Sequence, residues 1–269
     1  MATTSRKKVV PAKVATAATV PIQSVEQAMS QAWQHLSEGR PRQAETLCAQ
    51  LVKRYPEHDH GWYIRGVAVA MLDKHALALK HFDHVKNSPD LLPAVEQARG
   101  RSYLSLGQFE QALHHLQQAL MYKPDDAQCY YLMGVTEYQN GRTAEARRFF
   151  QQAVLLEPQL GPAHFELGTL ALQAGDATRA IGHFSTAATL LPQAPEVLNN
   201  LGLSHQSLGQ TQQAESSFRA ALKVLPGYAE AWFNLGLLLR QQGSNEAEAA
   251  LRQALQLNPL LREALPDGA

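Results

Sequence analysis

The sequence of 269 residues predicts an all-α protein in which one two-helix unit is repeated seven times. The first observation is an alanine that recurs every 34 residues, with a last interval of 33. The second is that glycine and proline recur at fixed offsets from this alanine. A constant period of this length is typical of helical repeat proteins, in which each unit buries its apolar face against its neighbours. The alanines are Ala44, Ala78, Ala112, Ala146, Ala180, Ala214 and Ala247.

The first helix of each unit is predicted from apolar residues at helical spacing, as in the stretches 62–72 and 232–240. A glycine stands inside this helix, 12 residues before the alanine and 11 before it in the last unit. Glycine in a helix interior costs about 1 kcal/mol relative to alanine, so its recurrence indicates a close approach of two helices. These glycines are Gly66, Gly100, Gly134, Gly168, Gly202 and Gly236.

A second glycine column predicts the turn between the two helices of each unit. It contains Gly39, Gly107, Gly141, Gly175, Gly209 and Gly243, with Asp73 in its place in the second unit. The second helix, as in 146–156, is followed by a proline, which neither donates a backbone hydrogen bond nor fits inside a continuing helix. The prolines are Pro56, Pro89, Pro124, Pro158, Pro192, Pro226 and Pro259, of which Pro89 comes one residue early.

These columns resemble the tetratricopeptide repeat family. The first-helix signature is matched by Trp62 with Gly66 and by Trp232 with Gly236. The second-helix signature is an alanine, an aromatic residue, an alanine and a proline. The resemblance covers residues 25–261, as seven repeats, and implies a right-handed superhelix of about fourteen helices that holds other proteins. The second-helix signature is read from Ala146, Phe150, Ala153 and Pro158, and again from Ala214, Phe218, Ala221 and Pro226.

The two ends depart from the repeat. Residues 1–24 are basic, rich in Ala and Thr and free of acidic residues, which predicts a disordered tail; a mitochondrial transit peptide is the alternative. In the first repeat Gln31 and His35 replace apolar residues, as expected of a terminal repeat with one uncovered face. Residues 262–269 are a short tail or a truncated capping helix, so we expect a longer chain, a partner or a second copy to cover that end.

Charge and composition narrow the class of partner. The formal net charge is zero, and beyond residue 24 there are 20 Lys and Arg against 24 Asp and Glu, which gives no electrostatic reason for a nucleic-acid partner. No apolar run approaches the roughly 18 residues of a membrane span. Cys48 and Cys129 lie in different repeats and form neither a disulfide framework nor a metal pair, which favours a reducing, cytoplasmic location.

The sequence contains no pattern typical of catalysis or of a cofactor. The eleven histidines include His58 with His60 and His81 with His84, but neither pair has the further ligands that zinc needs. No glycine-rich phosphate loop and no nucleophile motif is present. We therefore expect a protein that is not an enzyme and that binds no metal or cofactor.

The resemblance implies a concave groove lined by the first helix of each repeat. Its aromatic and amide side chains suit an extended peptide or a docked helix. Tyr131, Tyr138 and Phe165 are expected to face the groove and to contribute little to packing within a repeat, although packing against a neighbouring helix is the alternative. The predicted groove residues are Trp33, Tyr63, Gln97, Arg101, Tyr131, Tyr138, Gln139, Phe165, Gln173, Asn199, Asn200, Gln206, Phe233 and Asn234.

Two comparisons within the family refine this groove. Chaperone-binding members hold a carboxylate with basic and amide side chains, whereas the equivalent columns here contain Met29, Trp33 and Tyr63. Members that resemble O-linked N-acetylglucosamine transferases carry an asparagine ladder, and here only Asn200 and Asn234 match it. The expected function is a scaffold or adaptor that binds a protein or peptide. The alternatives are a substrate-recruiting module of a larger sulfotransferase or glycosyltransferase, and a scaffold that self-assembles through its C-terminal face.

Overall fold

The computed structural model describes residues 24–265, and every regular element in that range is helical, so the predicted all-α fold of about fourteen helices is confirmed. Fourteen α-helices and two 3₁₀ helices are formed between Ser24 and Leu265. The elements are α1 (Val25–Ser37), α2 (Pro41–Arg54), α3 (Asp59–Ala70), α4 (His75–Phe82), η1 (Pro89–Leu91), α5 (Leu92–Ser105), α6 (Phe109–Tyr122), α7 (Ala127–Gln139), α8 (Thr143–Leu156), α9 (Gly161–Gln173), α10 (Ala177–Leu190), α11 (Pro195–Ser207), α12 (Thr211–Val224), α13 (Ala229–Gln241), α14 (Ala247–Leu257) and η2 (Pro259–Ala264).

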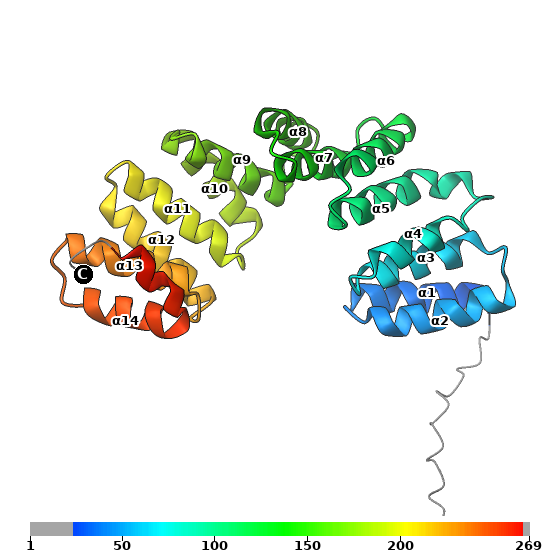
Figure 1. The fold of residues 1–269 in the computed structure, drawn as a ribbon, viewed down its shortest axis with the longest axis horizontal. Helices are drawn as coiled ribbons and strands as arrows, with labels where there is room; N and C mark the ends of the chain where they lie inside the picture. The colour runs from blue at the N-terminus through cyan, green and yellow to red at the C-terminus, as the bar shows by residue number, and fades with distance from the viewer. Residues whose placement is uncertain (1–23, 266–269) are drawn as a thin grey trace, which may run out of the picture. The chain divides into compact units, whose positions relative to one another are not determined.

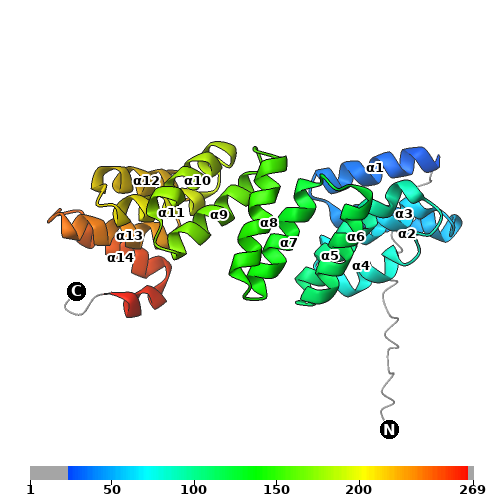
Figure 2. The same ribbon diagram turned by 90° about the horizontal axis from the view of Figure 1, so that it is seen from above.

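The helices pair as antiparallel hairpins, and the chain divides into two compact units between Ser88 and Pro89. The first unit contains the hairpins α1–α2 and α3–α4. The second unit contains five hairpins, from α5–α6 to α13–α14, which follow one another in chain order (Figure 1). The view from above shows the same succession of hairpins within that unit (Figure 2).

The division falls where one helix is unusually short. Helix α4 has eight residues, whereas the other second helices have 11 to 14. Residues 83–88 read DHVKNS, with Asp, Asn, Ser and a β-branched Val, all of which favour a helix less than the QQALMY of the next repeat. The buried carboxylate of Asp59 accepts hydrogen bonds from the backbone N–H of Lys86, at 3.1 Å, and of Asn87. Asp59 therefore binds the chain where the helix has ended.

The glycines inside the first helices lie against large side chains of the second helices, as predicted. Phe150 is fully buried, and a Cβ atom on Gly134 would lie 2.5 Å from its Cε1 atom. The same close approach joins Gly168 to Phe184 and Gly202 to Phe218. Each phenylalanine therefore fills the space that the glycine of its own repeat leaves open.

The turn column also has the expected conformation. Its six glycines have φ between 68° and 80°, a left-handed conformation that glycine adopts without strain. Asp73 is the one other residue between 24 and 265 with a positive φ, at 58°. This column therefore requires a positive φ, and Asp73 adopts it in the second repeat.

A contact that the sequence analysis did not predict ties three of the repeats to the preceding proline. The indole N–H of Trp62 donates to the carbonyl oxygen of Pro56 at 2.7 Å, and that of Trp232 to Pro226 at 2.8 Å. His164 occupies the same position, with Nε2 3.1 Å from the carbonyl oxygen of Pro158. A carbonyl only accepts, so this Nε2 carries a proton, and the His164 Nδ1 lies 3.2 Å from the Nδ1 of His183.

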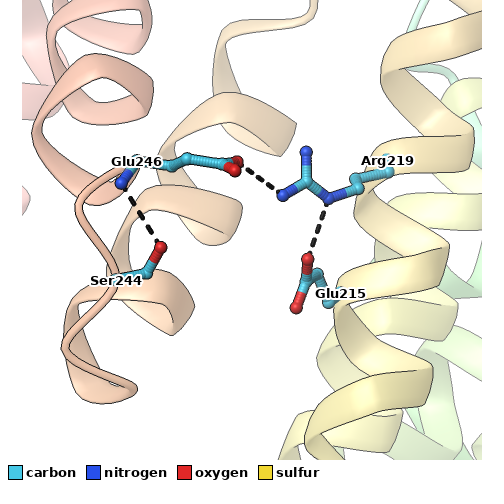
Figure 3. A network of polar contacts seen from close by, with 4 residues as sticks. All are labelled: Glu215, Arg219, Ser244 and Glu246. Atoms are coloured by element: carbon cyan, nitrogen blue, oxygen red, sulfur yellow. Dashed lines mark hydrogen bonds and ion pairs between the residues drawn. The ribbon is translucent and has the colours of Figure 1, made fainter.

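The last repeat is one residue shorter, and a polar network joins the start of its second helix to the repeat before it (Figure 3). Helix α14 begins only at Ala247, after Glu246 at its N-cap position. The guanidinium of Arg219, on α12, donates to Glu215 at 2.9 Å and to Glu246 at 2.7 Å. The backbone N–H of Glu246 donates to the Ser244 hydroxyl at 3.3 Å. These contacts position the shortened first turn.

The two ends of the described chain are finished differently. The Ser24 hydroxyl caps α1 by accepting from the backbone N–H of Gln27 at 3.1 Å. At the other end Leu261 and Leu265 pack against Phe233, Leu251 and Ala254, while Leu260 is 75% exposed. Of the predicted N-terminal tail, residues 1–24, only Ser24 is among the described residues. Residues 266–269 of the predicted C-terminal tail also lie outside the described residues. A surface hollow at the first hairpin is lined mainly by polar side chains, from Gln31, His35, Arg42, Gln43, Thr46, Leu47 and Gln50.

Candidate functional site

The first helices of the second unit lie side by side and present one surface. Helix α5 contacts α7, α9 contacts α11, and α11 contacts α13. A hydrogen bond from Gln173 on α9 to Tyr138 on α7 completes the series. We call this the first-helix surface and define it by Gln97, Arg101, Tyr131, Tyr138, Gln139, Phe165, Glu166, Gln173, Asn199, Asn200, Gln206, Phe233 and Asn234, all but one of which were predicted as groove residues.

The aromatic rings of this surface also belong to the packing of their own repeats. The ring centroid of Tyr131 lies 5.9 Å from that of Phe150, and Phe165 lies 5.9 Å from Phe184. Phe233 is buried against Leu251. The expectation that such rings contribute little to packing within a repeat is therefore wrong for Tyr131 and Phe165. The reason is that the neighbouring phenylalanine, which fills the glycine gap, extends far enough to reach them.

Several predicted amides join adjacent repeats. The side-chain N–H of Gln173 donates to the Tyr138 hydroxyl at 2.8 Å. The side-chain N–H of Asn234 donates to the side-chain oxygen Oδ1 of Asn199 at 2.9 Å. Asn199 is buried. The side chain of Gln97 lies 3.4 Å from an Asp126 oxygen. These contacts fix the amides in place, and each amide keeps further donor or acceptor capacity.

Other polar side chains of the surface have no such internal role. Within residues 24–265, no hydrogen bond or ion pair is formed by the side chains of Arg101, Gln139 and Gln206. Asn200 receives one long contact of 3.5 Å from Asn199. The capacity of these groups to bind is therefore available to a partner.

Glu166 is a residue that the sequence analysis missed. It stands on α9 at the position of Leu132 on α7, which is buried, and its own side chain is half-buried. Burial raises the pKa of its carboxyl group. Burial also raises the pKa of the Tyr131 hydroxyl, with a further rise from Glu166 and an opposing effect from Arg101. A charge at a column otherwise occupied by the uncharged residues Ile64, Ala98, Leu132, Asn200 and Asn234 was the signal that could have found it.

The first unit presents a separate aromatic surface. Trp33 is 44% exposed, and its ring centroid lies 6.0 Å from that of Tyr63. Tyr63 is half-buried and also lies 6.2 Å from Phe82, so it too contributes to the core of its repeat. Trp33 is thus the predicted aromatic residue of this unit with the most accessible ring.

The two cysteines lie outside these surfaces and are buried. Burial raises the pKa of Cys48 to about 12 and that of Cys129 to about 11, which keeps both as thiols rather than nucleophilic thiolates. No group of three His, Cys, Asp or Glu side chains between residues 24 and 265 converges as a metal site would require.

None of the helices between residues 24 and 265 combines the length and apolar character of a membrane span.

A stack of helical hairpins with one helix of each hairpin on a shared surface defines a helical repeat protein. The chain belongs to the tetratricopeptide repeat family, whose profile matches residues 29–91, 98–162, 158–195 and 199–265. The resemblance on which the fold was predicted is therefore confirmed. No curated protein sequence matches the chain.

Solved structures with the same fold share about a fifth of their sequence with this chain. One chain of the APC/C hetero-tetramer Cut9–Hcn1 is 19% identical with a TM-score of 0.71, and the match covers 91% of this chain and 50% of that one. YrrB, described as a TPR protein with an unusual peptide-binding site, is 21% identical with a TM-score of 0.56, over 71% of this chain and 98% of its own. MamA from Desulfovibrio magneticus RS-1 is 18% identical with a TM-score of 0.55, over 64% and 96%.

Proposed function

We propose that this protein is a non-enzymatic scaffold that binds an extended peptide segment of a partner along the first-helix surface of its second unit. The observation that carries the proposal is a set of polar side chains on the first helices that have no internal partner or, for Asn200, only one long contact of 3.5 Å. Arg101, Gln139, Asn200 and Gln206 come from α5, α7 and α11, so a segment that contacts all of them must extend over several repeats.

The chemistry of these groups suits a peptide backbone. Amide side chains both donate and accept hydrogen bonds, so Gln139, Asn200 and Gln206 can pair with backbone N–H and C=O groups in an extended chain. The half-buried rings of Tyr131 and Phe165 supply apolar area next to them. YrrB, which has the same fold, is described as having a peptide-binding site, and this supports the same class of ligand here. The buried, unpaired cysteines favour a reducing compartment, and we propose the cytoplasm.

The test replaces glutamines of the first-helix surface and leaves its aromatic residues unchanged, because Tyr131 and Phe165 also pack within their own repeats. A synthetic peptide is selected from a random phage-displayed library against the intact chain, and its Kd is measured by fluorescence polarisation. The triple variant Gln139→Ala, Gln173→Ala and Gln206→Ala is expected to weaken binding by about tenfold or more, equivalent to about 1.4 kcal/mol. The helical circular dichroism spectrum is expected to stay unchanged.

The control replaces three exposed glutamines of second helices. The variant Gln117→Ala, Gln151→Ala and Gln212→Ala removes the same side chains from α6, α8 and α12. It is expected to bind with the Kd of the natural chain. Equal loss of affinity in both triple variants, or in the control alone, would show that the peptide binds elsewhere.

A further inference from the structure

Glu166 is the one charged residue at a position that holds Ile64, Ala98 and Leu132 in three repeats and Asn200 and Asn234 in the last two. The equivalent Ile64 and Leu132 are buried, at 0% and 6% exposure. No hydrogen bond or ion pair reaches the Glu166 carboxylate from any residue between 24 and 265. A partly desolvated charge without a partner lowers stability, and residues kept at such a cost are typical of functional sites.

Arg101 is the matching cation. It is exposed on α5 and has no ion-pair partner within the described residues. Tyr131, on α7, is affected by both charges: Glu166 raises the pKa of its hydroxyl and Arg101 lowers it. Helix α7 contacts α5, which carries Arg101, and is joined to α9, which carries Glu166, by the hydrogen bond from Gln173 to Tyr138.

Building on the proposed function, we propose that this surface selects a peptide segment with an acidic side chain for Arg101 and a basic side chain for Glu166, and thereby fixes the direction in which the segment binds. Arg101 and Glu166 stand on first helices two repeats apart. Packed helix axes lie about 8–10 Å apart and an extended chain rises about 3.3 Å per residue, so two such steps place the two charges of the segment about five to six residues apart.

The direction follows from the two opposite charges. A segment bound in reverse would place its acidic side chain on Glu166 and its basic side chain on Arg101. Like charges held together in a partly desolvated site disfavour that arrangement, which is how charge patterns give specificity. The amides of Gln139 and Asn200 are uncharged, so they bind a backbone in either direction and do not discriminate.

The first test compares libraries selected on two forms of the intact chain. Phage-displayed random peptides selected on the natural chain are expected to share an acidic and a basic residue at this spacing and in one order. The double variant Arg101→Glu and Glu166→Lys is expected to select the opposite order. A natural-chain peptide is expected to bind the double variant at least about tenfold more weakly.

The second test uses stability as an independent readout. Glu166→Leu installs the residue that α7 has at the same position, and it is expected to raise the melting temperature while it weakens peptide binding by about tenfold. Glu166→Gln, which keeps the shape of the side chain without its charge, is expected to weaken binding similarly.

The outcomes separate this inference from the proposed function. Peptides that need Gln139, Gln173 and Gln206 but share no charge pair would overturn the inference and leave the peptide-binding function standing. The same order of charges selected by the natural chain and by the double variant would also overturn it. If no peptide is enriched on the natural chain, both proposals fail.

Discussion

Single residues of this chain are constrained either by the space around them or by their backbone conformation. Gly134 illustrates the first constraint, because a fully buried phenylalanine ring stands where its Cβ would be. Gly141 illustrates the second, since its φ of 80° is left-handed although nothing lies within 4 Å of a Cβ placed there. Gly182, inside α10, has neither constraint. The three glycines therefore have different sensitivities to the same substitution.

We expect Gly134→Ala to destabilise the protein and Gly182→Ala to stabilise it. The methyl group at 134 overlaps Phe150, and overpacking of this kind costs about 1–3 kcal/mol. At 182 the methyl group enters open space and removes the helix penalty of glycine, which is worth about 0.5–1 kcal/mol. Thermal melting followed by circular dichroism measures both changes. A shift of the same sign in both variants would contradict the packing described for Gly134.

His81 makes the stability of the first unit depend on pH. Its side chain is buried, its Nε2 has no hydrogen-bond partner, and its ring lies 5.6 Å from Trp62. Burial, with a smaller effect of Arg65, lowers the pKa of His81 from 6.5 to about 4. The folded-state pKa is below the unfolded value, so the unfolded state binds more protons between these limits. Stability is therefore present above pH 6.5 and is lost as the pH falls toward 4.

The measurement is the melting temperature of the intact chain between about pH 7.5 and pH 5. His81→Phe removes the titrating group from the buried site and is expected to reduce the fall in melting temperature across this range by several degrees. Melting curves whose pH dependence is the same for the natural chain and the variant would show that His81 is protonated without cost.

The second helices of the repeats have one common length, from which two of them differ. The second helix has 14 residues in five of the seven repeats. It is shortened at its end in α4 and at its start in α14. Each change has its own polar compensation, from Asp59 at Lys86 and Asn87 and from Arg219 at Glu246. Only the second compensation is an ion pair on the surface, so only it should respond to salt.

Arg219→Gln is expected to lower the stability of the second unit slightly. The two carboxylates raise the pKa of the Arg219 guanidinium, but the side chains are well exposed, and exposed ion pairs contribute about 0–1 kcal/mol. We expect a fall in melting temperature of one or two degrees at most, which disappears in about 1 M NaCl, where the Debye length is about 3 Å. A larger loss that salt does not change would indicate that Arg219 acts through packing of its aliphatic part.

The whole molecule consists of units that differ in their capacity to fold alone. In a helical repeat protein each repeat contacts its neighbours, and about three repeats are needed for a stable stack. The second unit contains five repeats with core clusters of their own, whereas the first contains two. Independent folding is therefore expected of the second unit only.

Residues 89–265 produced alone are expected to be helical and to unfold cooperatively on heating. Residues 24–88 produced alone are expected to have a weak helical signal, because two repeats leave much of their apolar surface in water. Circular dichroism of the two fragments decides the matter. A stable, cooperatively folded fragment 24–88 would mean that the contacts of Asp59 and the cluster around Ile64 are sufficient without a third repeat.

The amino-acid sequence alone determined the repeat, its two helices and the glycine and proline columns, because these depend on local backbone preferences and on a period that seven copies confirm. The register of the repeat also predicted which amides of the first helices belong to the groove, and this stays a prediction. The tertiary structure decided three things that register does not contain. The rings of Tyr131, Phe165 and Phe233 pack within their repeats, because the partner phenylalanine or leucine reaches them across the hairpin.

The division at Ser88 and the place of Glu166 were decided in the same way. A short helix followed by Pro89 looks like a small irregularity in sequence, and its effect on compactness depends on contacts between residues far apart in the chain, such as Asp59 with Lys86. Glu166 shares its register with the buried Ile64 and Leu132 and with the polar Asn200 and Asn234, so register does not decide its burial. The tertiary structure leaves the carboxylate half-buried and without a partner among residues 24–265, because burial is a property of neighbours and not of position in the repeat.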